Sequence, residues 1–391
     1  MRIVHLLPAL TKGGGERMAV DLANHAAATG HQVTVVAGYP VDPALLRDSL
    51  SESVDVRFVS KARTGRFNHY LDGMLWLKRN AGWLAEQDVL HCHLTYGAVM
   101  GALARLHRRL RGRARPTIVE TYHGVGMFVP AASRWFHSRL ATQRDALVLM
   151  ARDDYWCRFV AARPKLVSEV IPNGVAVADG VIGDDERLAY RRQAGIPDDA
   201  NLVIGTVGQL RADRQPWLYL PIFAEMARAL GPKCHFVMAG DGPEYGRLEE
   251  MVKEHGLTGR VHLPGLAPTG RLPISIMDLY LTLNVGPITG IAALEAAFDR
   301  TPVVAIQLIE GRRADTGDWI WSSSDLAEVA AHSIELLRSP DRLRTLAESQ
   351  HAYATANHGV DIMAKAYMEL YRRAIARTES RHSLGNANAD Q

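Results

Sequence analysis

Short apolar runs alternate with helical patterns along the first half of the chain. The run at 2–7 precedes a helical pattern at 16–30, in which Met18 and Leu22 lie four residues apart, and a second apolar run follows at 31–38. A strand, helix and strand in this order predict parallel pairing, because parallel strands need a long crossover connection. Further strand candidates lie at 54–60, 88–94, 116–123, 146–151 and 168–174.

The same alternation restarts in the second half, after a polar and turn-rich stretch. Strand candidates there lie at 202–210, 234–240, 261–265, 277–284 and 301–307. This pattern predicts an α/β fold with two doubly wound, Rossmann-like domains, whose strand ends would face a central cleft. The domains are expected at 1–180 and 181–360, with a helix at 361–376 that packs back on the first domain and a disordered tail at 377–391.

Composition is that of an ordinary globular protein, with 47% apolar and 22% charged residues among 391. The net charge of +3 makes no strong field, and no nucleic-acid partner is expected. Six arginines at 105–116 could face anionic headgroups or acidic substrates, although a solvated helix end is the simpler interpretation. The isolated Cys92, Cys157 and Cys234 predict reduced thiols. Reduced thiols in turn predict a cytoplasmic protein. No apolar run is long enough to span a membrane, so any contact with the inner face of the membrane would be peripheral.

A glycine-rich turn joins the first predicted strand to its helix. Gly13, Gly14 and Gly15 let the backbone approach a ligand closely, and the helix N-terminus offers unpaired amides with partial positive charge. A phosphate or a sugar would suit this turn, and a tight turn without a ligand is the alternative. The spacing is not G-x-G-x-x-G, which argues against a dinucleotide-binding dehydrogenase.

Three histidines lie near the ends of predicted strands in the first half, namely His91, His93 and His123. Their residue type allows a zinc site, but no recognised ligand spacing supports one, so hydrogen bonding is favoured over metal. His123 follows a strand and precedes glycines, which predicts a ring that projects into the cleft. A core or capping histidine is the alternative.

Two segments of the second half combine polar groups with predicted strand ends. Arg211 and Arg214 could bind a diphosphate, because guanidinium groups fit phosphate oxygens in pairs; solvated loop arginines are the alternative. Glu295 lies on an otherwise apolar helix, so its carboxylate needs a partner that offsets its loss of hydration. The glycine-rich turn that begins at 239 is expected to shape the cleft.

The motifs "TYHG", "IPNGV", "VGQL" and "AGDGP" and the helix with Glu295 follow the glycine loop in this order. In this order the chain resembles the retaining glycosyltransferases of family 4, which have the GT-B architecture, over residues 2–375. The resemblance implies transfer of a sugar from a nucleotide diphosphate sugar to an acceptor hydroxyl with retention of configuration. It implies that the first domain binds the acceptor and the second the donor. No cofactor and no metal are expected, since protein cations would stabilise the diphosphate.

The resemblance also implies roles for residues of the second domain. Glu295 matches a glutamate that contacts the ribose hydroxyls, and Arg214 can keep the positive charge of a family lysine toward the diphosphate. Gly290 and Ile291 would present backbone amides to the diphosphate, with Thr289 beside them. These residues form the expected donor site.

In the first domain, the resemblance places Gly14 and Gly15 near the diphosphate and the acceptor. His123 matches a histidine that helps to place the donor sugar, and it is a catalytic candidate together with Arg214. His93 and Asn173 are expected on the acceptor side.

Two positions depart from the family pattern. Pro287 stands where the family has a glutamate that touches the transferred sugar, and Gln209 stands where it has an arginine. Losing one phosphate contact could weaken binding tenfold or more, and Arg211 is a candidate to compensate. A catalytically weak or inactive nucleotide-binding protein is therefore one alternative, and a sugar-nucleotide epimerase of GT-B shape is another.

The acceptor is expected to be a saccharide or a lipid-linked saccharide, as in the synthesis of a cell-surface polysaccharide or lipopolysaccharide. The segments at 65–84 and 126–140 combine aromatic and basic residues, which suits a membrane surface. Core helices with ordinary aromatic residues explain these segments nearly as well.

Overall fold

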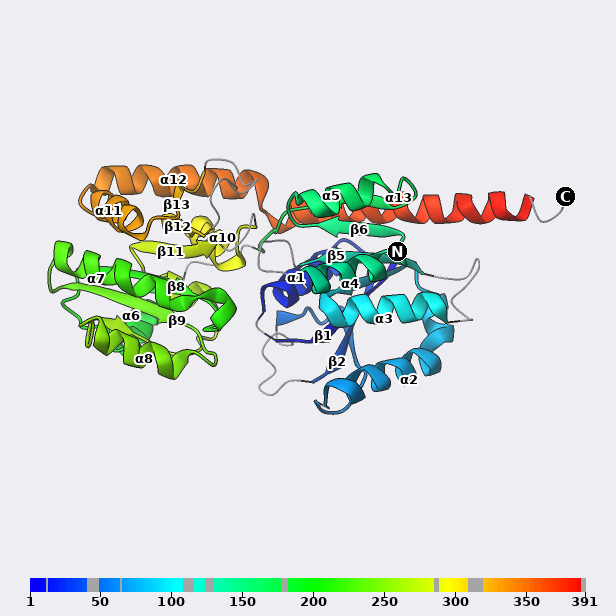
Figure 1. Ribbon diagram of the computed structural model, residues 1–391, viewed down its shortest axis with the longest axis horizontal. Helices are drawn as coiled ribbons and strands as arrows, with labels where there is room; N and C mark the ends of the chain where they lie inside the picture. The colour runs from blue at the N-terminus through cyan, green and yellow to red at the C-terminus, as the bar shows by residue number, and fades with distance from the viewer. Residues whose placement is uncertain are drawn as a thin grey trace. The chain divides into compact units, whose positions relative to one another are not determined.

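The structure, a computed structural model, divides into two compact units (Figure 1). Unit 1 spans Met1–Val125, Val129–Ala176 and Val360–Gln391, and unit 2 is mainly Val177–Gly359. The described residues are 1–11, 13–40, 49–63, 65–107, 116–123, 130–176, 182–284, 288–308 and 319–387. Most of the arginine-rich run at 105–116 and the start of the segment at 126–140 lie outside them.

Unit 1 is built on a seven-stranded sheet in the order β3-β2-β1-β4-β5-β6-β7. Every described strand pair is parallel. The strands are β1 (Arg2–Ala9), β2 (Gln32–Tyr39), β3 (Val54–Phe58), β4 (Val89–His93), β5 (Thr117–Tyr122), β6 (Ala146–Leu149) and β7 (Val167–Val170). Nearly continuous apolar runs form them because helices cover both faces of the sheet.

Six helices of unit 1 cover the sheet: α1 (Gly14–Ala28), α2 (Arg66–Ala85), α3 (Leu94–Leu106), α4 (Ala131–Ala141), α5 (Asp154–Ala161) and α13 (Val360–Ala387). α1 and α13 pack on one face, where Ile3 and Leu7 meet Tyr367 in one core. α2 and α3 cover the other face, where Leu6 and Leu90 meet Met100. Figure 1 shows α13 returning from unit 2 to lie along unit 1.

The last helix differs from its sequence-based prediction. A helix at 361–376 with a disordered tail was expected, whereas α13 continues to Ala387. Burial of Met363, Met368 and Leu370 against the sheet of unit 1 explains the first turns of this helix. The polar stretch that follows extends the helix because it contains no proline and only one glycine before Ala387.

Unit 2 has a six-stranded sheet in the order β10-β9-β8-β11-β12-β13, and its described strand pairs are also parallel. The strands are β8 (Leu202–Val207), β9 (Cys234–Ala239), β10 (Val261–His262), β11 (Leu279–Asn284), β12 (Val303–Gln307) and β13 (Ser322–Ser323). The helices are α6 (Asp184–Gln193), α7 (Tyr219–Leu230), α8 (Tyr245–Glu254), α9 (Arg271–Ile274), α10 (Ile291–Phe298), α11 (Leu326–Leu337) and α12 (Pro340–Asn357), with the 3-10 turns η3 (Ala212–Arg214) and η4 (Pro216–Leu218).

Both sheets reverse their strand order at one point, between β1 and β4 in unit 1 and between β8 and β11 in unit 2. The chain leaves the carboxyl ends of these two strands in opposite directions, which opens a crevice for ligands in doubly wound folds. The loops after β1, β4, β8 and β11 are therefore where each unit is expected to bind a ligand.

Candidate functional site

The glycine turn of unit 1 brings the start of α1 against two side chains that directly follow the strands β4 and β5. Gly13 caps α1 without a side-chain hydrogen bond, and Gly14 is exposed. A Cβ atom at Gly15 would lie 3.1 Å from both His123 Nδ1 and Leu94 Cδ2. Gly15 is thus needed for close packing, and His123 lies beside the first amides of α1.

Four histidines form one cluster on the face of the sheet that α1 and α13 cover. His5 of β1 pairs in register with His91 of β4, and His93 lies two residues further along the same face. His5 Nδ1 lies 3.0 Å from His93 Nε2, and His93 Nδ1 lies 3.4 Å from His123 Nε2. Three of these rings are candidates from the sequence, whereas His5 is not, because only the register of β1 against β4 brings it into the cluster.

Burial keeps this cluster neutral. It lowers the pKa of His5 to about 3 and that of His123 to about 4, and it holds the pKa of His91 and His93 well below the usual 6.5. An uncharged imidazole has one donor and one acceptor nitrogen, so each ring can both give and receive a hydrogen bond.

Residues of α13 complete the surroundings of His91. Its Nδ1 lies 2.7 Å from the hydroxyl of Tyr371, and its Nε2 lies 2.8 Å from Thr121 Oγ1. Thr121 in turn lies 2.9 Å from the hydroxyl of Tyr367. These contacts tie the last helix to the polar centre of unit 1.

The same rings contain the geometry of a metal site. One ligand atom each from His5, His91 and His93 lies within 4.8 Å of the others. However, both nitrogens of His91 already have hydrogen-bond partners, and the 3.0 Å separation of His5 Nδ1 and His93 Nε2 is that of a hydrogen bond. The arrangement therefore fits a hydrogen-bonded cluster better than an occupied coordination sphere.

The other acceptor-side candidate, Asn173, is buried in the loop after β7. The neighbouring Gly174 N–H lies 3.1 Å from the sulfur of Met363 on α13. This turn is packed into unit 1 near the start of the last helix.

Unit 1 also has a pocket of about 520 Å³ among the helices α2, α3 and α4. Its lining residues are Tyr70 of α2, Thr95 and Val99 of α3, and Ser133, Phe136 and His137 of α4. His137 Nε2 lies 3.3 Å from Thr95 Oγ1. Aromatic rings with a few hydroxyl and imidazole groups suit a ligand of saccharide size.

In unit 2, the loop after β8 holds three of the predicted donor residues, all exposed. Arg211 forms an ion pair with Asp213, with Nε 2.9 Å from Oδ1. Arg214 ends the turn η3 and forms no ion pair with any residue that the structure describes. Gln209 is exposed next to them. Arg214 is thus the more available cation for a diphosphate.

The glycine-rich turn that begins at 239 supports this loop. Leu210 N–H donates to the carbonyl of Asp241 over 3.0 Å, and Glu244 N–H donates to the carbonyl of Leu210 over the same distance. Gly240 has a φ of +149°, and a Cβ atom there would collide with the carbonyl of Gly208. The turn therefore holds the loop after β8 in place, and its expected role in shaping the ligand site stays a prediction.

The helix α10 places the remaining donor residues after β11. Gly290 is its exposed N-cap, without a side-chain cap, and Ile291 is its first residue. Thr289 is buried directly before them. Pro287 lies outside the described residues.

Glu295 is a buried carboxylate, 6% exposed, one turn inside α10. A Cβ atom at Gly270 would lie 2.7 Å from its Oε2, so this side chain points toward the start of α9. Arg271 of α9 donates to both carboxylate oxygens of Asp299, with Nη2 2.6 Å from Oδ1. That hydrogen bond, together with the charges of Asp299 and Glu295, raises the pKa of Arg271. Arg271 was not predicted from the sequence, since only the fold places α9 beside α10.

Two family profiles together cover most of the chain. That of Glycosyltransferase Family 4 matches residues 12–179, and that of glycosyl transferases group 1 matches residues 186–351. The chain belongs to glycosyltransferase family 4. This family 4 enzyme is 28% identical over 313 residues to 2-deoxystreptamine glucosyltransferase of Streptomyces kanamyceticus. The aligned region covers 70% of this chain and 76% of that protein.

A second relative matches nearly the whole family 4 enzyme. 2-deoxystreptamine N-acetyl-D-glucosaminyltransferase of Streptomyces fradiae is 25% identical over 402 residues, 93% of this chain and 92% of that protein. The crystal structure of Anabaena HepE in complex with UDP and glucose has a TM-score of 0.75 at 17% identity, over 94% of this chain and 99% of that one. The likeness shows the GT-B fold that the sequence predicted.

Proposed function

We propose that this glycosyltransferase is a retaining hexosyltransferase that moves a sugar from a nucleotide diphosphate sugar to a hydroxyl of a saccharide or lipid-linked acceptor. The observation behind the proposal is Glu295, a buried carboxylate beside the switch point of the unit 2 sheet. A carboxylate there can accept two hydrogen bonds from ribose hydroxyls, each contributing about 1.5–3 kcal/mol. HepE, whose structure was solved with UDP, supports a nucleotide donor.

The leaving diphosphate is the second element of the proposal. Arg214 of η3 and the backbone amides of Gly290 and Ile291 at the start of α10 would stabilise its developing negative charge, because a guanidinium and unpaired amides both donate to phosphate oxygens. A diphosphate oxygen on the same face of the sugar would take the proton of the acceptor hydroxyl. The proposal needs no metal ion, since Arg214 and the backbone amides at the start of α10 would offset the charge of the leaving diphosphate.

We assign the acceptor to the 520 Å³ pocket of unit 1, whose lining includes aromatic and polar side chains. The two Streptomyces relatives are named for transfer to 2-deoxystreptamine, so an aminocyclitol belongs in the acceptor panel beside saccharides and lipid-linked saccharides.

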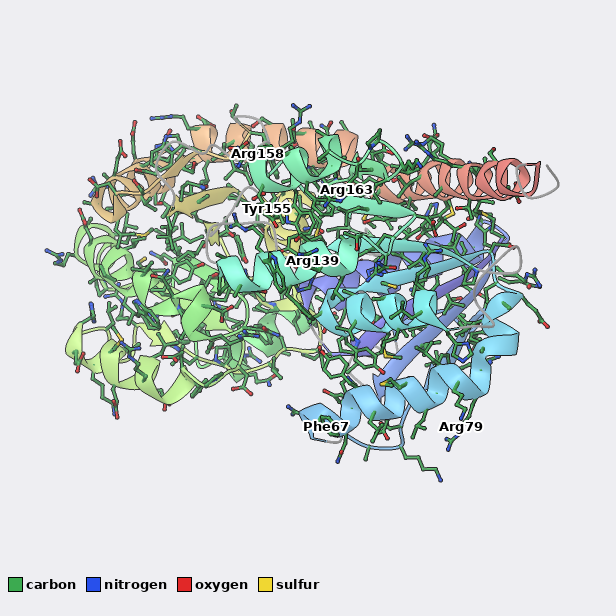
Figure 2. The ribbon with its side chains drawn as sticks, turned by 45° about the vertical axis from the view of Figure 1, so that its right-hand side comes forward. Phe67, Arg79, Arg139, Tyr155, Arg158 and Arg163 are labelled. Atoms are coloured by element: carbon green, nitrogen blue, oxygen red, sulfur yellow. The ribbon has the colours of Figure 1, made fainter. Side chains whose placement is uncertain are left out.

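A lipid-linked acceptor in surface polysaccharide or lipopolysaccharide synthesis is supported by the outer face of α2. Four apolar side chains are exposed there, namely Phe67, Leu71, Met74 and Leu75. Lys78 and Arg79 follow on the same helix, and Figure 2 shows Phe67 and Arg79 pointing away from the sheet. Apolar and basic groups on one helix suit peripheral contact with the inner face of the cytoplasmic membrane. No described helix is long and apolar enough to cross a membrane.

The test is a transfer assay with a panel of nucleotide sugars and acceptors, in which NMR reads the anomeric configuration of the product. We expect retention, and an inverted product would contradict the proposal. Glu295→Gln should weaken nucleotide binding by tenfold or more, measured by calorimetry. The control Glu254→Gln changes an exposed carboxylate of α8 and should leave binding unchanged.

A nucleotide-binding protein without transferase activity is the second candidate, and Gln209 in place of a basic residue favours it. Nucleotide binding without turnover on any acceptor would support this candidate. An epimerase would instead convert the free nucleotide sugar in the absence of an acceptor, which the same NMR experiment detects.

A further inference from the structure

Three rings of unit 1 form a line from the core to the glycine turn. His5 Nδ1 lies 3.0 Å from His93 Nε2, His93 Nδ1 lies 3.4 Å from His123 Nε2, and His123 Nδ1 lies next to Gly15. At the inner end, His5 Nε2 is buried and has no hydrogen-bond partner among the described residues. The line therefore ends on one side in the core and on the other beside α1.

Neutral rings restrict this line to two arrangements. Burial keeps all three pKa values far below neutrality, so each ring has a single N–H. If His5 Nδ1–H donates to His93 Nε2, the single proton of His93 lies on Nδ1 and is donated to His123 Nε2. The proton of His123 then lies on Nδ1. In the reverse arrangement His123 donates inward, and its Nδ1 is a bare acceptor.

The inner end favours the first arrangement. In the reverse one, His5 would hold an N–H in the core without an acceptor, and orphaned buried N–H groups are rare in proteins. In the first, His5 leaves only a bare nitrogen there. At the outer end, an N–H on Nδ1 joins the uncapped amides of α1 as a further donor.

We propose that His5 and His93 are positioning residues that hold His123 in its Nδ1–H tautomer, so that the ring donates to a substrate oxygen at the Gly14–Gly15 turn. This inference rests on the proposed function for the identity of that substrate, a nucleotide sugar or its acceptor. The arrangement of protons itself is a property of the free protein.

The tautomer of His123 can be read by NMR on protein with 15N-labelled histidine, its signals assigned by their loss in His123→Gln. We expect Nδ1–H in the wild type. In His93→Leu the ring should revert to Nε2–H, the form that free histidine prefers. His93→Asn should restore Nδ1–H, because the amide nitrogen of asparagine occupies the place of Nδ1 and can donate.

A matched control lies in unit 2, where His235 Nδ1 is 3.1 Å from His262 Nε2. His235→Leu breaks a similar pair and should leave the His123 signals unchanged. If His93→Leu does not fold, His5→Leu and His5→Asn provide the same contrast. Nε2–H in the wild type, or an Nδ1–H form of His123 that persists in both leucine variants, would overturn the proposal. A zinc ion that survives dialysis on His5, His91 and His93 would overturn it as well.

Kinetics separate this inference from the proposed function. We expect kcat/KM with a nucleotide sugar to fall at least tenfold in His93→Leu and to recover largely in His93→Asn. If no nucleotide sugar is turned over but the tautomers change as expected, the proposed function fails and the positioning role stands. Full activity in His93→Leu, with the tautomer changed, would show that the N–H is not used and would overturn the role assigned to it.

Discussion

At the scale of single residues, the two arginines after β8 differ in what they already bind. Arg211 is paired with Asp213, whereas Arg214 forms no ion pair within the described ranges. We expect Arg214→Ala to raise the Kd for UDP about tenfold, a loss of about 1.4 kcal/mol, and Arg211→Ala to change it less than threefold. Calorimetry with UDP and GDP measures both. A larger effect of Arg211→Ala would show that Arg211 compensates for Gln209.

The buried histidines make the stability of unit 1 depend on pH. The folded protein holds the pKa of His5 near 3 and those of His91 and His93 well below 6.5, while the unfolded chain protonates these rings below about pH 6.5. Because the unfolded state then binds more protons, stability falls as pH decreases below 6.5. Each ring contributes up to about 1.4 kcal/mol per pH unit until its folded pKa is reached.

Urea denaturation at pH 7.5, 6.5 and 5.5, followed by circular dichroism, measures this slope. His5→Leu removes one of the three rings and should make the slope shallower, whatever it does to stability at neutral pH. Equal slopes in the wild type and the variant would mean that His5 accepts a proton within the fold.

The sequence singles out candidate residues where the chemistry is local. Glu295 is visible in the sequence because a carboxylate interrupts an apolar helix, and Arg214 because it follows a strand end. His5 and Arg271 are not visible in this way, since each acquires its partner from a residue that is distant in the chain. Positions defined by strand register or helix packing need the fold before their partners can be named.

At the scale of elements, the packing of the loop after β8 against the glycine-rich turn that begins at 239 depends on Gly240. Gly240→Ala would place a Cβ atom against the carbonyl of Gly208 at a φ of +149°, so we expect a loss of about 1–3 kcal/mol and a lower Tm. Gly246 is in α8 with open space around it, and Gly246→Ala should keep or raise Tm. Calorimetric melting compares them, and an unchanged Tm in Gly240→Ala would contradict the packing described.

The elements themselves followed from the sequence because apolar periodicity and glycine stops are local signals. All the strand candidates of both halves are present, from 2–7 in β1 to 301–307 in β12. The end of α13 was not predicted, because a polar stretch without breakers is compatible with either a helix or a disordered tail.

At the scale of the whole molecule, the chain passes from unit 1 to the main segment of unit 2 after Ala176 and returns to unit 1 with α13. Alternating strands and helices predicted two α/β domains. No local pattern in the sequence shows how deeply the last helix is buried in the first domain. Met368, Leu370 and Tyr371 lie in its core, and each large apolar side chain buried there contributes about 1.5–3 kcal/mol. Together these contributions rival the stability of a whole domain.

This topology predicts opposite behaviour for the two halves when they are produced separately. The fragment 177–359 contains the core of unit 2 and all its donor residues, so it should fold alone and bind UDP within about threefold of the full chain. The fragment 1–176 lacks α13 and should aggregate or stay partly unfolded. Co-expression with residues 360–391 should rescue it, since α13 then covers the exposed face of the sheet. Hydrogen exchange and calorimetry measure the outcome, and a stable, well-protected fragment 1–176 would show that α13 contributes less than its buried side chains indicate.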